Sequence, residues 1–248
     1  MALSLPSIVT PALLSSIRSQ PNLPRHTWYY IAATTLTVLN RPDEIPKIYK
    51  HAIDHGPDNV DKPPSHDEQL KISRRIREAL VKTAAIGGLP KVGSRVLVHA
   101  VTNRAPALEL TLTQTINSLL ELKKATPLPL VDEPMGYSPT ARAVEMYDIP
   151  TSQILHRGQI FFDKVYGKVS KRVMGQMDRS GTEDLGLTAR LVYGYLLSNT
   201  SVLSHAETSY VLIAGLIPQD VCRRLDRLLA SAPNVCGETG FRLRVSDM

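Results

Sequence analysis

The sequence predicts an all-α protein. Almost every segment repeats its apolar residues with the 3.6-residue period of an amphipathic helix, and runs that alternate like a strand are scarce. Only three Phe and one Trp are present, so the core must consist mainly of Leu, Ile, Val and Ala. Apolar residues at 43% and charged residues at 21% are typical of a globular protein, and 248 residues can bury a substantial core.

Helix-capping and helix-breaking residues set the ends of the expected helices in the first half of the chain. A short helix is expected over residues 11–19, and a second follows Pro24 and stops before residues 40–42. Asp43 caps a third helix over residues 44–55. Ser65 with Glu68 three positions later forms a capping box for a long helix over residues 67–86, which two glycines end.

The second half continues the helical period. The turn at residues 180–182, followed by Glu183, leads into one helix, and Pro218 just after Gly215 marks the exit from one helix and the entry into the next. Helices are expected over residues 110–125, 139–147, 151–165, 168–176, 182–197, 202–216 and 218–230. We expect one all-helical domain over residues 1–232, with the Pro-rich stretch 126–139 as its hinge, and a weakly ordered tail over residues 233–248.

The net charge of +6 does not predict a nucleic-acid partner. The basic residues are scattered and have apolar residues between them at helical spacing, which is typical of the solvated face of an amphipathic helix. No apolar run reaches the ~18 residues that a membrane-spanning helix needs, so we expect no membrane partner.

Cys222 and Cys236 form neither a CxxC pair nor a metal spacing, which indicates a reducing compartment. We expect the cytoplasm, with the mitochondrion as the alternative.

Residues 182–221, TEDLGLTARLVYGYLLSNTSVLSHAETSYVLIAGLIPQDV, form two expected helices folded back on each other around a polar stretch at 198–201. Together with PRHTWYYIAATTLTVLNRPDEIPKIYKHAI, IREALVKTAAIGGLPK and TINSLLELKKATPL, they resemble longer fungal members of the carboxymuconolactone decarboxylase / alkylhydroperoxidase-D-like (AhpD-like) family. The resemblance covers most of residues 22–221. It implies an AhpD-like helical bundle, with the C-terminal hairpin as its core and active centre, that assembles into a homo-oligomer.

The chain departs from that family pattern in two ways. Residues 92–114 interrupt the pattern, and we interpret them as a retained intron, with a genuine insertion as the alternative. The redox relay of the peroxidase branch is also missing. Thr200 and Leu203 stand at its cysteine positions, Glu207 at its histidine position and Thr188 at its glutamate position. Thr and Leu cannot form a sulfenic acid or a disulfide, which argues against peroxide reduction by this route.

The candidate catalytic residues are therefore Glu207, His205 and Tyr195. The decarboxylase branch needs an acid or base beside a carboxylate, and these side chains could supply it. The competing interpretation is structural, because Glu207 in a first turn favours the helix dipole and a buried tyrosine is often a core residue. Our first hypothesis is a carboxymuconolactone decarboxylase-like protein that acts on or binds a small organic acid or lactone. The alternatives are a non-catalytic oligomeric helical scaffold or binding protein and, third, an alkylhydroperoxidase-like antioxidant, so catalysis itself stays open.

The sequence predicts neither a metal nor a cofactor. His51 and His55 stand one helical turn apart and His66 follows, but no further ligand has a diagnostic spacing. The glycines lack the context of a phosphate-binding loop, and no GxSxG elbow is present.

Overall fold

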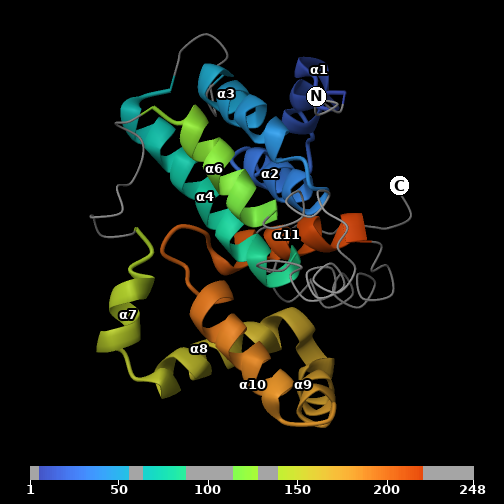
Figure 1. Ribbon diagram of the computed structural model, residues 1–248, viewed down its shortest axis with the longest axis vertical. Helices are drawn as coiled ribbons and strands as arrows, with labels where there is room; N and C mark the ends of the chain where they lie inside the picture. The colour runs from blue at the N-terminus through green and yellow to red at the C-terminus, as the bar shows by residue number, and fades with distance from the viewer. Residues whose placement is uncertain (1–5, 56–63, 88–113, 128–138, 220–248) are drawn as a thin grey trace, which may run out of the picture. The chain divides into compact units, whose positions relative to one another are not determined.

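The fold is helical throughout the part of the chain that the structure, a computed structural model, describes: residues 6–55, 64–87, 114–127 and 139–219 (Figure 1). None of these residues lies in a β-strand, and the predicted all-α class is confirmed. The chain divides into two compact units, Met1–Val131 and Asp132–Met248, and the division falls inside the stretch 126–139 that was expected to be a hinge. The expected single domain over residues 1–232 stays a prediction.

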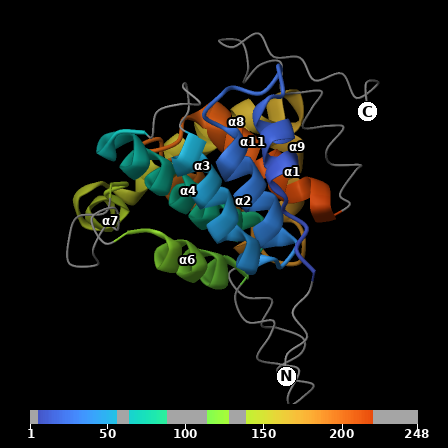
Figure 2. The same ribbon diagram turned by 90° about the horizontal axis from the view of Figure 1, so that it is seen from above.

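Unit 1 contains α1 (Pro11–Arg18), α2 (Trp28–Val38), the 3-10 turn η1 (Pro42–Glu44), α3 (Ile45–His55), α4 (His66–Gly87) and α6 (Gln114–Ala125). Helix α2 packs on α4, and α6 lies against α2, α3 and α4 (Figure 2). The capping box of α4 forms as predicted. The Glu68 carboxylate accepts the Ser65 N–H at 2.8 Å, and Ser65 Oγ accepts the Glu68 N–H at 3.3 Å.

The core of unit 1 combines large apolar side chains with buried polar ones. Its largest fully buried residues include Tyr30, Tyr49, Ile45, Ile48, Ile76 and Leu80. A line of polar contacts joins α2 to its neighbours, since Thr34 meets Thr83 of α4 at 3.3 Å and Thr37 meets Ser118 of α6 at 2.8 Å. Buried hydroxyls that bond one another fix the lateral register of packed helices, because a slipped register would leave them unpaired.

One buried carboxylate fastens the N-terminal segment to unit 1. Glu44 is fully buried, and its oxygens accept hydrogen bonds from Arg41 at 2.7 Å, Lys47 at 2.8 Å, Ser7 at 3.2 Å and the Ile8 N–H at 3.1 Å. Burial alone would raise the pKa of Glu44, but the hydrogen bonds from Lys47, Ile8 and Ser7 outweigh it and hold the pKa below its ordinary value. Glu44 is therefore a charged anchor between residues 7–8 and the start of α3.

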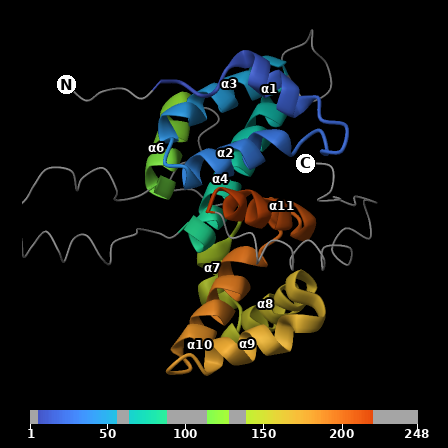
Figure 3. The same ribbon diagram turned by 90° about the vertical axis from the view of Figure 1, so that its right-hand side faces the viewer.

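Unit 2 contains α7 (Arg142–Asp148), α8 (Thr151–Tyr166), the 3-10 turn η3 (Gly167–Val169), α9 (Ser170–Asp178), α10 (Asp184–Leu191), the π-helical segment η4 (Val192–Leu197), α11 (His205–Leu216) and η5 (Ile217–Gln219). Helix α8 packs against η4, α9 and α10 (Figure 3). Phe161 and Phe162 are fully buried, and α8 ends at Tyr166, one residue beyond the helix expected over residues 151–165.

The helix limits differ from the predicted ones mainly in unit 2. The helix expected over residues 182–197 changes from α to π at Val192, and the one expected over residues 202–216 begins at His205, because Ser204 caps it. The interruption expected over residues 92–114 lies outside the described residues except for its last residue, and the tail at 233–248, Cys222 and Cys236 lie outside them as well.

Candidate functional site

The hairpin of unit 2 is anchored where two glycines let backbones meet. A Cβ built on Gly158 of α8 would overlap the backbone of Gly194, and one built on Gly194 would lie 2.8 Å from the Ile154 carbonyl oxygen. Only residues without a side chain allow this approach. The crossing places the end of η4, and the loop that follows it, directly against α8.

Arg157 of α8 binds the hairpin beside this crossing. Its guanidinium forms a two-point ion pair with Glu145 of α7, at 2.9 and 3.3 Å. The same group donates to Ser198 Oγ at 3.0 Å and to the Gly194 carbonyl at 3.2 Å. A bidentate guanidinium–carboxylate pair fixes both partners in orientation as well as in position. Arg157 thereby links α7, α8 and the end of η4.

Asn199 completes this arrangement from the loop. Its amide donates to Glu145 Oε1 at 3.2 Å and to the Thr140 carbonyl at 3.1 Å, while its own oxygen accepts the Ser201 N–H at 3.1 Å. We call Glu145, Arg157, Ser198 and Asn199 the polar junction. Ser198 and Asn199 are buried, whereas the Arg157 side chain is 32% exposed and the Glu145 side chain 14%. The charges of the polar junction compensate each other at the edge of solvent.

Tyr195 and Tyr193 lie two positions apart on η4 and point to different sides of it. The Tyr195 hydroxyl donates to the Arg142 carbonyl of α7. Burial, and then the negative charge of Glu145, raise the pKa of Tyr195 above its ordinary value. Tyr193 packs edge-on against Phe162, with ring centroids 4.8 Å apart. Tyr195 therefore belongs to the neighbourhood of the polar junction, and Tyr193 to the aromatic core.

His205 and Glu207 both lie in the first turn of α11, but they make different contacts. The His205 ring stacks on Phe161 of α8, with centroids 4.9 Å apart, and its Nε2 is buried. The Glu207 carboxylate accepts the Ser204 N–H at 3.0 Å, and Ser204 Oγ accepts the Glu207 N–H at 3.3 Å. Glu207 thus closes a capping box in the first turn of α11, where its negative charge also favours the helix dipole.

The three candidate catalytic residues thus have different partners. Tyr195 contacts α7, His205 contacts α8, and Glu207 caps its own helix. Their catalytic role stays a prediction. The residues at the expected positions of the peroxidase redox relay differ in solvent exposure: Thr188 and Thr200 are exposed, whereas Leu203 is fully buried.

Sequence reasoning missed Glu145 and Arg157. The signal that could have found Arg157 is its place one residue before Gly158 and four before Phe161, on a helix face that is otherwise apolar. A charged residue on a buried face needs a partner of opposite charge. Nothing in the sequence identifies Glu145 as that partner, since it lies twelve positions away across a helix break.

Two further observations concern metal sites and membrane-spanning helices. Within residues 6–55, 64–87, 114–127 and 139–219, no group of three His, Cys, Asp or Glu side chains is placed to hold a metal ion. No helix in the same ranges is long and apolar enough to cross a membrane.

Two curated relatives match the chain along most of its length. One is named "Peroxisomal protein 2", from Schizosaccharomyces pombe, and is 34% identical over 207 residues, which are 83% of this chain and 76% of the relative. The other has the same name, comes from Saccharomyces cerevisiae, and is 28% identical over 256 aligned positions that cover 85% of this chain and 82% of the relative. No family model and no solved structure matches.

These comparisons correct several expectations. The resemblance to the carboxymuconolactone decarboxylase / AhpD-like family is contradicted, because no family model matches and both relatives carry another name. The decarboxylase-like function on a small organic acid or lactone is contradicted with it, and the names support neither the scaffold nor the peroxidase alternative. The expected cytoplasmic or mitochondrial location is contradicted as well, because both relatives are named as peroxisomal proteins. The resemblance rested on the hairpin and three further helical segments, and the residues of the family's redox relay were already missing from it. The chain belongs to the family of peroxisomal protein 2.

Proposed function

We propose that this protein works in peroxisomes. The observation that carries the proposal is the 34% identity over 83% of the chain to a protein named for that organelle. The second relative, at 28% identity over a similar share, supports it. Identity spread over most of the chain argues for a shared role of the whole protein and not of one exchangeable segment.

Fluorescence microscopy tests this location. The full chain is expressed in fungal cells with a fluorescent protein at the N-terminus and, separately, at the C-terminus, beside a peroxisomal marker. At least one of the two fusions should appear in the same puncta as the marker, and those puncta should vanish in cells that lack peroxisome biogenesis. Diffuse or mitochondrial signal from both fusions would refute the proposal.

For the molecular role, we infer that the hairpin of unit 2 binds a small polar molecule, with Tyr195, His205 and Glu207 as its candidate contacts. The supporting observation is the π-helical segment at Val192–Leu197, since π-helical turns are rare and frequently occur at functional sites. Next to it, the Gly194 carbonyl accepts from both Ser198 and Arg157, so polar groups gather at the end of this segment.

Native mass spectrometry of protein purified from fungal cells tests this role. Wild type should carry a small molecule that Tyr195→Phe and His205→Phe lose, because these changes remove a hydroxyl and ring nitrogens but keep the aromatic rings. The matched control is Tyr147→Phe on α7, whose side chain is exposed and which should leave the molecule bound. Equal retention in all variants would place the molecule elsewhere and sink this assignment.

Self-association through α7 is a second part of the proposal. No residue of α7 is buried, and its apolar side chains Val144, Met146 and Tyr147 are all exposed. Several exposed apolar side chains on one short helix are typical of an interaction surface. Light scattering coupled to size exclusion should give a mass above the 27.3 kDa of one chain, and Met146→Glu should return the mass to that of a monomer. A monomeric wild type would contradict this part.

A further inference from the structure

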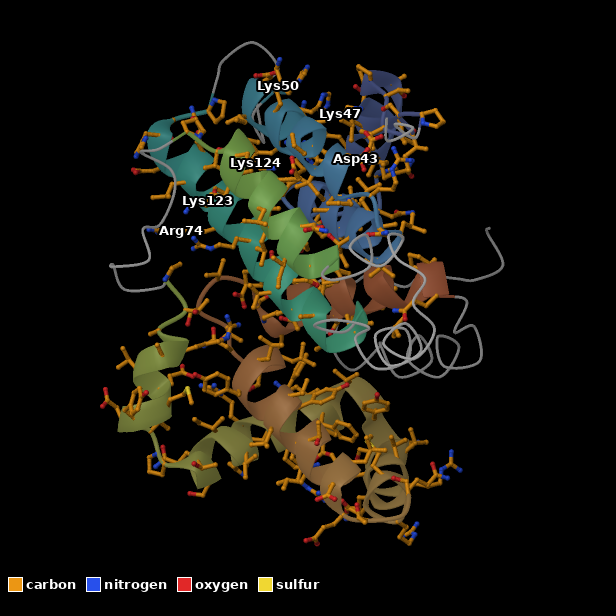
Figure 4. The ribbon with its side chains drawn as sticks, viewed as in Figure 1. Asp43, Lys47, Lys50, Arg74, Lys123 and Lys124 are labelled. Carbon is orange, nitrogen blue, oxygen red and sulfur yellow. The ribbon has the colours of Figure 1, made fainter. Side chains whose placement is uncertain are left out.

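Unit 1 carries most of the positive charge of the described residues. It holds twelve Lys and Arg against seven Asp and Glu, whereas unit 2 holds eight against seven. Part of this excess forms what we call the basic face: Lys47 and Lys50 on α3, Lys123 and Lys124 on α6, and Arg74 on α4. Figure 4 shows these residues over helices that pack on one another. The four lysines are exposed.

Nearby acids neutralise only part of the basic face. Lys47 pairs with the buried Glu44 at 2.8 Å, and Lys124 pairs with Glu121 at 2.5 Å. Asp43, at the edge of the basic face, pairs with Arg41 at 3.0 Å. Lys50 and Lys123 form no ion pair with any residue in the described ranges. No acid of the described residues therefore compensates these two exposed ammonium groups.

Exposed aliphatic side chains adjoin the lysines. On α6, Ile116 is 46% exposed and Leu120 is 48% exposed. Both share a helix face with Lys123 and Lys124, because positions separated by three, four, seven or eight residues lie on one side of a helix. The outward surface of α6 thus has the two properties that hold a helix at a charged lipid surface: aliphatic groups to insert and cations to meet the headgroups.

The composition of the basic face favours lipid over protein. Surfaces that bind a protein partner are enriched in Arg and aromatic residues and depleted in Lys. The basic face has four Lys, one Arg and no aromatic residue. Lysine is a compact, strongly hydrated charge without a fixed hydrogen-bonding geometry, which suits mobile headgroups. We propose that the basic face adsorbs the protein to an anionic phospholipid surface. This proposal does not depend on the proposed function. It restricts the earlier expectation of no membrane partner, which then holds only for a membrane-spanning helix and not for binding at a membrane surface.

Flotation of the full chain with vesicles tests the proposal. The protein should float with vesicles of phosphatidylcholine and phosphatidylserine but not with phosphatidylcholine alone. The binding should weaken at high salt, because the Debye length falls from about 10 Å at 0.1 M to about 3 Å at 1 M. The double change Lys50→Gln and Lys123→Gln should weaken binding about 25-fold, since each lysine near an anionic membrane contributes about fivefold.

A matched control variant separates the effect of the basic face on vesicle binding from the effect of net charge. The double change Lys164→Gln and Lys171→Gln removes the same charge from exposed positions of unit 2 and should leave binding unchanged. Circular dichroism should show that both double variants keep the wild-type helix content. Equal loss of binding in both would show that net charge alone acts, and equal flotation with neutral vesicles would show that the anionic headgroups are not recognised. Binding to duplex DNA or an acidic peptide without binding to vesicles would assign the basic face to another partner. Each of these three results would overturn the proposal.

Discussion

Gly158 of α8 and Gly194 of η4 touch through their backbones, so that a single added methyl group on either would collide with the other helix. We therefore expect Gly158→Ala to lower the free energy of unfolding by about 2 kcal/mol or more, as overpacking of a tight contact does. Thermal unfolding followed by circular dichroism measures the loss. The control is Gly175→Ala in α9, where the new methyl group would meet only the flexible end of Arg179, at 3.2 Å. That change should be neutral or stabilising by up to ~1 kcal/mol, because Ala favours a helix over Gly.

The glycine contact also shows what sequence reasoning could reach. The apolar period predicted the helices of both units, and the capping box at Ser65 and Glu68 predicted the start of α4. The apolar period did not predict the change to a π-helix at Val192, and it did not predict that Gly194 within this segment contacts a helix more than thirty residues earlier. The same holds for the polar junction, whose partners come from three separate elements. The local sequence pattern indicates which face of a helix is buried, but it does not indicate which residues of other helices that face contacts.

A second prediction concerns Glu44. We expect Glu44→Gln to destabilise unit 1 by about 3 kcal/mol, since removing one partner of a buried ion pair leaves the other charge uncompensated. Asp43→Asn, at an exposed carboxylate, should cost less than about 1 kcal/mol. Denaturant unfolding of the two variants measures the difference. Similar midpoints for both would show that the Glu44 network does not hold residues 7–8 in place.

The third prediction is a pH dependence set by His51 of α3. Burial, then the charges of His55 and Arg18, lower the pKa of His51 below its ordinary value, and Asp54 opposes them only in part. Its ring lies edge-on to Trp28 and next to His55, with centroids 5.6 and 4.1 Å away. Because the unfolded chain binds this proton more readily than the folded one, stability must fall as the pH drops below about 6.5. Above that pH the His51 ring is neutral in both the folded and the unfolded state, so it no longer makes the stability depend on pH.

Melting temperatures between neutral and mildly acidic pH test the role of His51. His51→Phe keeps a ring beside Trp28 but cannot take up a proton, so its melting temperature should fall less than that of wild type over the same interval. His66→Gln, at an exposed position, should follow the wild-type curve. Parallel curves for wild type and His51→Phe would assign the acid sensitivity to other groups.

The last prediction tests the polar junction through Asn199, whose amide donates to Glu145. Asn199→Asp would replace that donor with a second carboxylate facing Glu145. Two like charges in a buried site repel each other, and the Thr140 carbonyl would also lose the Asn199 donor, so we expect a loss of about 1–3 kcal/mol in the free energy of unfolding. Thr200→Asp, one residue further at an exposed position, adds the same charge and should cost much less. The penalty of Asn199→Asp should shrink at low pH, where protonation of either carboxylate relieves the repulsion. A penalty that does not change with pH would show that Glu145 and Asn199 are not electrostatically coupled.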